Sequence, residues 1–443
     1  MVAFLLVALI SDMATVLTPP VVGTGGPSVA LSRIELREIL SEALAPIDQS
    51  ERLLAIVADK TRDDNTPTLF PLAAQLLAER GVTQLDVLIA QGTHGQMSAE
   101  DKQRKIGADE IPGMPVGEIF DHRWDQPEEL ITIGELNSKE VALITGGLIE
   151  KRVRLTINRL LRPGAYDSVL VFGGTVPHEV AGFAGGAKYF FPGVAGPELT
   201  HATHWLAALA TVEQIIGRVE TPTRHLIEAA ADFISPRVIS LTSVVTRDAQ
   251  HQLQTHALFG GDIRLALRSA VEVSRQVHIK YTGRKYRRVV ALLDKHYDEL
   301  WVGGKASYRL GPVIESGGEL IIYAPHLRCI SETHGHLIER YGYAPLETVR
   351  ELVAQSAELE ENLCVAAHLT QVAYAGRTDE SGRIVPRYRI TMATGIDEAT
   401  CRRVNLGYLD YRTFQRSDYE GDDETLVVER AGQDLYLVKP MNS

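Results

Sequence analysis

The stretch of the chain with the most residues able to do chemistry runs from residue 177 to residue 205. It holds three histidines and one lysine among five glycines, in the sequence PHEVAGFAGGAKYFFPGVAGPELTHATHW. A glycine-rich loop lets the backbone approach a ligand closely and offers N–H groups to an anion. The Walker A pattern is absent, and the dinucleotide fingerprint is missing from the early strand-to-helix turns. Nucleotide hydrolysis and ordinary NAD binding are therefore disfavoured.

The lysine and the histidines of this stretch each admit more than one interpretation. Lys188 ends the glycine run and could bind a phosphate or, as a desolvated amine, form a covalent adduct; a solvated loop lysine is the alternative. His201 and His204 lie three residues apart at a predicted helix start, so they share one face and could bind a metal. Together with His178 they could form the zinc site of a hydrolase, although no His-Glu-x-x-His motif accompanies them. Taken alone, His178 is more typical of a structural histidine.

Two polar clusters precede this stretch. Asp59 and Arg62, in the run Asp-Lys-Thr-Arg, could position an anionic substrate through the guanidinium fork, although a surface ion pair is the commoner meaning of this pattern. His94 lies in a predicted strand-to-helix loop, where a general base would be well placed. Neither cluster identifies a function by itself.

Alternating strands and helices must position these groups. Buried apolar runs predict strands at residues 53–58, 85–90, 141–145, 168–172, 289–293, 300–302 and 319–323, with turns at 303–304 and 317–318, and amphipathic patterns predict helices at 32–45, 69–80, 200–217 and 262–277. We expect two α/β domains, residues 1–285 and 286–443, with mostly parallel sheets wrapped by helices and the active site in the cleft between them. The last residues are expected to pack back on the first domain. Asp59, His94 and the turn at 173–174 all follow predicted strands, where such sheets gather ligands.

The composition bounds the class of protein. The chain has 443 residues, 45% of them hydrophobic, and a net charge of -12, which is typical of a soluble globular protein and argues against nucleic acid as the main partner. Its three cysteines fit neither a disulfide framework nor a cysteine zinc site, so we expect a reducing, cytoplasmic setting. The apolar run at residues 2–10 is about half the ~20 residues of a membrane span. We interpret it as an extension or a mis-chosen start, with Met13 as the alternative start, and expect no membrane partner.

Three motifs in the same order resemble those of the lactate racemase family, the nickel-pincer 2-hydroxyacid racemases and epimerases. The family's Asp-x-Thr-Arg corresponds to Asp59, Thr61 and Arg62, and its Gly-Thr-His ends at His94. Its pattern His-x3-Gly-Phe-x-Gly-Gly-x-Lys-x3-Pro-Gly, followed by Thr-x3-His, is met by His178, Gly182, Phe183, Gly185, Gly186, Lys188, Pro192, Gly193, Thr200 and His204. The match covers most of the chain and is strongest from residue 53 to residue 204.

The resemblance implies a cofactor, which is nickel in a pincer (pyridinium thiocarboxylate) mononucleotide derived from nicotinic acid mononucleotide. By position, Lys188 would hold this group covalently and His204 would ligate the nickel, with His201 only a neighbour. The further cofactor contacts implied are Asp59, Thr61, Gly185 and Gly186. The partners would be a small 2-hydroxyacid and the enzymes that make the cofactor, and a homo-oligomer is possible.

The resemblance also assigns His94 and His178 as the acid/base pair and Arg62 as a contact to the substrate's oxygens. Deprotonating the carbon next to a carboxylate is difficult, whereas taking a hydride from it gives a planar 2-keto acid that can receive the hydride back on either face. The cofactor would carry this step. A histidine's ordinary pKa of about 6.5 would suit the exchange of the hydroxyl proton near neutral pH.

The chain departs from the lactate-acting members of the family in its second half. Those members typically show Tyr-Gln, followed three residues later by Lys; here Tyr308 is followed by Arg309, and Pro312 stands at the lysine position. Because a proline cannot bind a carboxylate, we expect Lys305 or Arg309 to replace that cation and the substrate to be an acid other than lactate. Three histidines could line an enlarged pocket or be surface residues: His326, His334 and His336. The alternative function is a non-catalytic sensor that binds a hydroxyacid or a mononucleotide on the same fold.

Overall fold

The structure is a computed structural model, and it describes residues 20–110, 116–248, 250–295, 297–373, 376–381 and 383–440. The apolar run at residues 2–10 and the alternative start at Met13 lie outside the described residues.

The larger sheet has seven strands in the order β1-β11-β10-β7-β2-β3-β4. Its strands are β1 (Val22–Gly25), β2 (Leu53–Ala58), β3 (Leu85–Ala90), β4 (Val116–Asp121), β7 (Ser168–Gly174), β10 (Arg237–Arg247) and β11 (Leu253–Gly261). The strands from β10 to β4 are parallel, while β11 and β1 join antiparallel at one edge. The apolar runs predicted at 53–58 and 85–90 form β2 and β3 with the same bounds.

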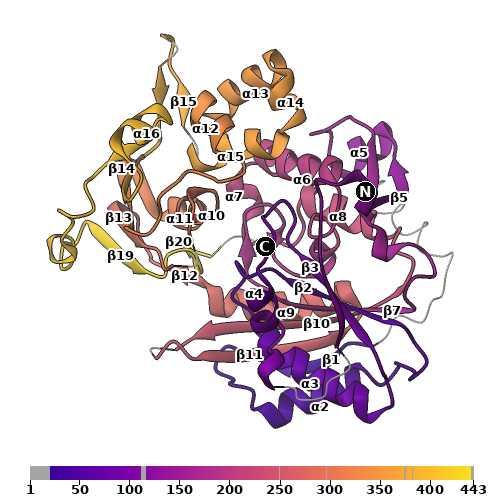
Figure 1. Cartoon of the computed structure of the whole chain (residues 1–443). Coiled ribbons are helices and arrows are strands. Elements are labelled where there is room, and N and C mark those ends of the chain that lie inside the picture. Colours follow the sequence, from indigo (N-terminus) through magenta and orange to yellow (C-terminus); the bar gives the residue numbers. More distant parts are fainter. Residues whose placement is uncertain are drawn as a thin grey trace.

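Helices cover both faces of this sheet (Figure 1). The helices α2 (Arg33–Ala43) and α3 (Thr66–Glu79) pack on one face, and α6 (Pro197–Ala210), α8 (Pro222–Ala231) and α9 (Ile263–His278) pack on the other. Ser32 and Glu35 form the capping box that starts α2, so the predicted helix at 32–45 is confirmed. The helix predicted over 200–217 is wrong in its second half. Thr211 has a φ of 69°, which ends α6 and separates it from the short α7 (Val212–Ile215).

Two predicted strands are helices instead. Residues 141–145 belong mostly to α5 (Ser138–Ile144), where Asn137 caps the backbone N–H of Glu140 and the Glu140 side chain returns to the Asn137 N–H. Only Val141 is buried in α5, so the apolar run supplies one side of a helix. Residues 300–302 belong to α10 (Leu300–Gly303), and α11 (Lys305–Leu310) follows. The predicted turn at 303–304 is therefore a junction between two short helices.

The smaller sheet is wholly parallel, in the order β18-β17-β14-β13-β19. Its strands are β13 (Tyr286–Leu292), β14 (Ile314–Ala324), β17 (Arg389–Thr394), β18 (Gly407–Tyr408) and β19 (Thr425–Glu429). The strand predicted at 319–323 lies within β14, and the strand predicted at 289–293 lies within β13 except for its last residue. The turn predicted at 317–318 is wrong, because both glycines lie inside β14, where the register with β13 shifts. Such an irregularity is where a strand accommodates glycine.

The remaining elements flank the two sheets. They are α4 (Ala99–Lys105), β5 (Leu130–Leu136), β6 (Val153–Asn158), β8 (Pro177–His178), β9 (Gly182–Phe183), β12 (Ile279–Tyr281), α12 (Gly335–Tyr341), α13 (Leu346–Gln355), α14 (Ala357–Glu361), α15 (Leu363–Ala373), β15 (Arg377–Thr378), β16 (Ile384–Val385), α16 (Glu398–Arg403) and β20 (Leu435–Leu437). β12, which follows α9, pairs with β20, and α15 packs against α6, so both of these contacts join the two halves of the chain. The α/β class with mostly parallel sheets is confirmed, and the division at residue 285 stays a proposal.

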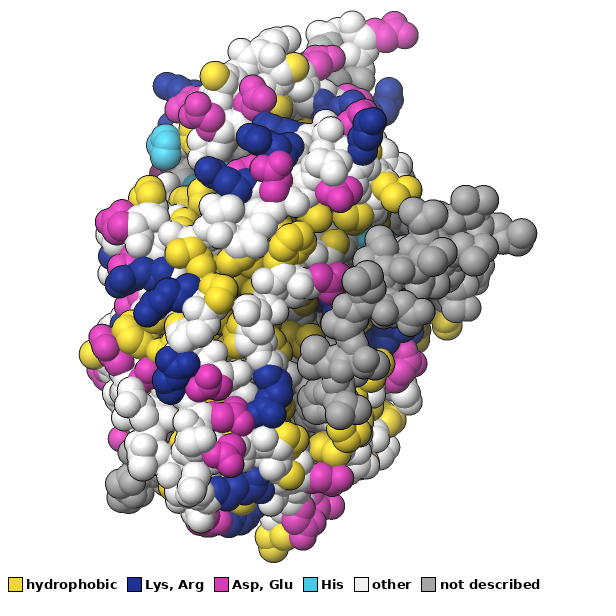
Figure 2. Space-filling model, turned by 90° about the vertical axis from the view of Figure 1, so that its right-hand side faces the viewer, with side chains coloured by type: hydrophobic (Ala, Val, Ile, Leu, Met, Phe, Trp, Pro, Cys, Tyr) yellow, Lys and Arg dark blue, Asp and Glu magenta, His cyan; other side chains and the backbone are white. Residues whose placement is uncertain are grey.

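The surface carries charges of both signs. Figure 2 shows basic and acidic side chains interspersed over one face, with hydrophobic side chains gathered in a band between them. Within the described ranges, every helix is too short or too polar to cross a membrane.

Candidate active site

One cavity of about 190 Å³ brings the two halves of the chain together around the predicted site residues. It lies beyond the carboxyl ends of β2, β3 and β7, the edge where parallel sheets gather ligands. Eleven of the twelve predicted site residues line it: Asp59, Thr61, Arg62, His94, His178, Gly185, Lys188, His204, Lys305, Tyr308 and Arg309. The twelfth, Gly186, is buried in the adjoining 3-10 turn and does not line the cavity.

Asp59 and His94 form a hydrogen-bonded pair. The Asp59 carboxylate receives the Nδ1–H of His94 on Oδ2 at 2.8 Å and the backbone N–H of Thr61 on Oδ1 at 2.8 Å. Burial alone would raise the pKa of Asp59, but the neighbouring charges of His94 and Arg62 hold that pKa below its ordinary value. A carboxylate that accepts from Nδ1–H leaves Nε2 of the ring as a proton acceptor. His94 is thus arranged as a general base.

His178 is arranged in the opposite sense. Its Nδ1 accepts the backbone N–H groups of Val180 and Ala181, at 3.1 and 3.4 Å, so the neutral ring carries its proton on Nε2. That Nε2 is buried and has no hydrogen-bond partner among the described residues. Burial, followed by the positive charges of Lys188 and Arg62, lowers the pKa of His178 well below its ordinary value. The expected pKa near 6.5 is therefore wrong for this histidine, which is neutral and presents an N–H donor.

Lys188 and His204 have the properties of a covalent anchor and a metal ligand. Burial, with a contribution from the charge of Arg62, lowers the pKa of Lys188 to about 7, so its amine is readily deprotonated. The Nδ1–H of His204 donates to the Thr200 carbonyl oxygen at 2.7 Å, which leaves Nε2 as a free ligand atom, and burial lowers the pKa of His204 to about 4.

His201 stands apart from these groups. It does not line the cavity, and its Nδ1 accepts the backbone N–H of Cys364 at 3.3 Å. Among the described residues, no three His, Cys, Asp or Glu side chains are grouped so that they could hold a metal ion. The zinc hydrolase built on His178, His201 and His204 is therefore contradicted. A site with one protein ligand, His204, is compatible with this geometry.

Lys305, Arg309 and Glu179 form a buried charged cluster on the side of the cavity facing α11. Burial and the charge of Arg62 lower the pKa of Lys305 to about 7, and its amine lies over the Tyr297 ring, 5.5 Å from the ring centre. Arg309 instead donates to the carbonyl oxygens of Pro177, at 2.8 Å, and Gln433. Burial alone would raise the pKa of Glu179, but Lys305 and Arg309 keep it below its ordinary value. Of the two cations predicted to replace the family's lysine, Lys305 is the one available to a ligand.

Sequence reasoning missed His368 and Trp301, which also line the cavity. His368 accepts or donates a hydrogen bond at each ring nitrogen, with the Tyr308 hydroxyl at 3.0 Å and the Tyr343 hydroxyl at 3.2 Å, and its ring lies 4.4 Å from that of Trp301. The three histidines considered for an enlarged pocket do not line it. His326 bonds the Tyr297 carbonyl, His334 packs on the ring of Trp301, and His336 is exposed.

Some known proteins resemble this chain over most of its length, and others resemble only part of its first half. The family "Lactate racemase N-terminal domain" matches residues 33–217. A lactate racemase from Thermoanaerobacterium thermosaccharolyticum is 25% identical over 155 residues, which is 35% of this chain and 32% of that protein, so the match spans about a third of the relative. That partial match does not assign an activity to this chain.

Two solved structures extend the likeness to the second half. A crystal structure of a Thermotoga maritima protein superposes with a TM-score of 0.86 and 32% identity, over 93% of this chain and 99% of that one. The lactate racemase apoprotein of T. thermosaccharolyticum shares the fold, with a TM-score of 0.67 and 17% identity over 93% of each chain. Residues 33–217, which carry the three motifs that meet in one cavity, belong to the lactate racemase N-terminal domain family.

Proposed function

We propose that the protein is a racemase or epimerase of a 2-hydroxyacid other than lactate and that it works with a nickel-pincer cofactor. The observation that carries this proposal is the presence of His94, His178, Lys188 and His204 around one buried cavity. A protein that only binds a hydroxyacid has no use for two imidazoles of opposite hydrogen-bonding character beside a nucleophilic amine and a free ligand nitrogen.

The residues present fit such a cofactor. Lys188 would hold it through its amine, whose pKa is lowered to about 7, and His204 would ligate the nickel through Nε2. Asp59, Thr61 and Gly185 line the same space, and Gly186 supports the loop behind them. When bound, the cofactor supplies a reversible acceptor for the hydride of the substrate's C2–H bond.

The chain's own residues then handle the substrate's oxygens. The free Nε2 of His94 would take the hydroxyl proton and later return it to the same oxygen, while the Nε2–H of His178 would donate a hydrogen bond to that oxygen from a second position on the cavity wall. Arg62 and Lys305 hold the carboxylate, so a planar 2-keto acid can turn between the two imidazoles while it stays anchored. Burial of the cavity-lining groups strengthens each of these interactions.

The test is an assay of chirality with the loaded enzyme. The protein, co-expressed with the enzymes that make the cofactor, is incubated with single enantiomers of aliphatic, aromatic, dicarboxylic and polyhydroxy 2-hydroxyacids, and the products are separated on a chiral column. Inversion of at least one of them at C2 is expected, together with nickel and an added mass on Lys188. Thermal stabilisation by an acid with no inversion would favour the sensor function instead.

A further inference from the structure

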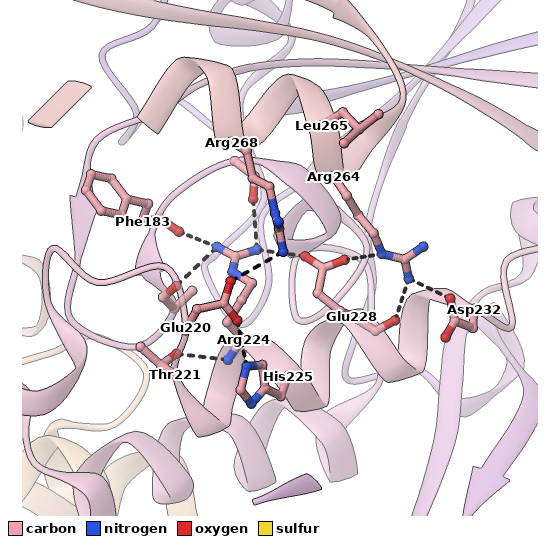
Figure 3. Close-up of polar contacts among 12 residues, drawn as sticks. Phe183, Glu220, Thr221, Arg224, His225, Glu228, Asp232, Arg264, Leu265 and Arg268 are labelled. Carbon is pink, nitrogen blue, oxygen red and sulfur yellow. Dashed lines mark hydrogen bonds and ion pairs between the residues drawn. The ribbon is translucent and has the colours of Figure 1, made fainter. Parts of the chain in front are cut away.

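A buried arginine lies behind the loop that joins His178 to Lys188. Arg224, near the start of α8, is 4% exposed and donates to three backbone carbonyl oxygens of one short segment. The acceptors are Gly185 at 3.3 Å, Ala181 at 3.1 Å, and Phe183. Figure 3 shows the guanidinium between this segment and the Glu228 side chain of α8. A single side chain thus donates hydrogen bonds to every second carbonyl oxygen of residues 181–185.

Two backbone hydrogen bonds also hold this segment, from the Gly217 N–H to the Gly182 carbonyl oxygen at 2.9 Å and from the Ala184 N–H to the Val176 carbonyl oxygen at 2.8 Å, and the Phe183 side chain is buried. The strand pairing of the segment is limited to the two-residue pairing of β8 with β9. Gly182 has a φ of +77°, and a Cβ there would lie 1.9 Å from the Arg218 carbonyl oxygen; Gly185 has a φ of +97°. Left-handed glycines turn their carbonyls out of a regular ladder, and buried carbonyls that leave a ladder need another donor. For the Gly182 carbonyl this donor is the backbone N–H of Gly217, and for the Gly185 carbonyl it is Arg224.

Arg224 is itself held by a second layer of charges (Figure 3). Its Nη1 lies 3.5 Å from Glu228 Oε1, and Arg264 donates to Glu228 Oε2 at 2.8 Å and to Asp232 at 2.6 Å. Arg264 belongs to α9, so these contacts connect residues 181–185 to α8 and α9, two helices that pack on the larger sheet. These ion pairs fix the position of the Arg224 guanidinium relative to the carbonyl oxygens that it contacts.

We propose that Arg224 is a positioning residue, which sets the placement of His178 and Lys188 by holding residues 181–185 between them. The proposal rests on the proposed function, because it concerns the two groups assigned to proton exchange and cofactor attachment. His178 keeps its tautomer through the N–H groups of Val180 and Ala181, at one end of the held segment. Lys188 follows three residues after the other end, in the 3-10 turn that begins at Gly186.

The key variant is Arg224→Lys, which keeps the positive charge but cannot reach three carbonyls at once. Its matched control is Arg80→Lys, because Arg80 donates to the carbonyls of Leu44 at 2.7 Å and Ser41 at 2.8 Å, away from the cavity. Two measurements on the cofactor-free protein avoid any dependence on turnover. One is the rate of reductive methylation of Lys188 at pH 8, followed by peptide mass; the other is the ¹⁵N shift pattern of the His178 ring.

We expect Arg224→Lys to change the Lys188 methylation rate at least fivefold and to replace the single His178 tautomer with a mixture, while Arg80→Lys changes neither. An unchanged rate together with an unchanged tautomer in folded Arg224→Lys would overturn the proposal, as would equal effects of the two variants. If Arg224→Lys does not fold, Glu228→Gln is used instead. We expect it to change the Lys188 methylation rate two- to fivefold, and an unchanged rate would overturn the proposal. Absence of racemisation by the loaded wild type would refute the proposed function without altering these results.

Discussion

Replacing Asp59 with Asn tests the arrangement of His94 directly. Both oxygens of the Asp59 carboxylate accept N–H groups, one from Thr61 and one from His94. An amide has a single acceptor, so in Asp59→Asn either the Thr61 N–H or the His94 Nδ1–H faces an NH₂ group. The imidazole escapes this conflict by moving its proton to Nε2, and His94 then no longer accepts a proton from the substrate.

The size of the effect follows from these contacts. A buried donor without a partner costs about 1–3 kcal/mol, and loss of a hydrogen bond to the charged imidazolium costs about 1.5–3 kcal/mol more in the transition state. At about 1.4 kcal/mol per tenfold, kcat is expected to fall by roughly 10²–10⁴-fold. The free energy of unfolding is expected to fall by about 1–3 kcal/mol at pH 7.

The pH dependence of the free energy of unfolding is a second, independent test of the Asp59 contacts. Because the folded protein holds the pKa of Asp59 below its ordinary value, its contribution to stability is fully present above the unfolded pKa of about 3.9 and is lost as pH falls toward the folded value. Wild type and Asp59→Asn should therefore differ in stability at pH 7, and the difference should shrink progressively as the pH falls from about 4 toward the lower folded pKa of Asp59.

The assays are urea unfolding at several pH values, ¹⁵N shifts of the His94 ring, and racemisation by the loaded enzyme. Thr61→Val is the matched control, since it removes the hydroxyl that also contacts Asp59 but keeps the backbone N–H and the carboxylate. It should leave the His94 tautomer unchanged. Wild-type kcat together with an unshifted His94 tautomer in Asp59→Asn would refute the role given to this pair.

Three further changes have effects that the structure specifies. Lys305→Met should weaken substrate binding yet raise the free energy of unfolding at pH 7 by about 1–4 kcal/mol, because the pKa of Lys305 in the folded state, about 7, lies below its unfolded pKa. In urea titrations, this difference in the free energy of unfolding should shrink as the pH rises to 10. Tyr308→Phe leaves Nδ1 of buried His368 unpaired, so a loss of about 1–3 kcal/mol is expected in urea unfolding, and equal stability would contradict the pairing. Lys105→Met strands the buried Asp64 carboxylate, which lies 2.9 Å from the Lys105 amine, and should cost about 3–5 kcal/mol, with much of the loss recovered in the double variant with Asp64→Leu.

In the larger sheet the central strands β2, β3 and β7 were predictable because they are buried on both faces, whereas β1, β4, β10 and β11 were not predicted. All six residues of β2 are buried, and such a continuous apolar run bounded by polar residues indicates a central parallel strand. The same signal misled at residues 141–145 and 300–302, because a run of three or four apolar residues suits one side of a helix equally well. At 141–145 the capping box of Asn137 and Glu140 was the available signal for a helix.

The site was predictable where local motifs carry it. His94, His178 and Lys188 each stand in a short pattern, whereas His368 lies in α15 with no motif around it and meets Tyr308 only through the packing of distant helices. Arg224 has the same character, since its partners lie about forty residues earlier in the chain. The low pKa of His178 was also invisible in the sequence, because burial and the cations that cause it come from separate elements.

The displaced cation of α11 bears on the kind of acid that the cavity accepts. The lactate-acting members carry a lysine four residues after the tyrosine, at the position of Pro312, whereas Lys305 stands three residues before Tyr308. On a helix these two positions are only about 20° apart around the axis, so both share a face with the tyrosine, but they are separated along it by about 10 Å. Here α11 spans Lys305–Leu310, Pro312 lies beyond it, and Lys305 and Tyr308 both line the cavity. Because Pro312 lies beyond α11, that helical spacing does not apply in this chain; we propose that Lys305 anchors the carboxylate from within α11, which favours an acid other than lactate.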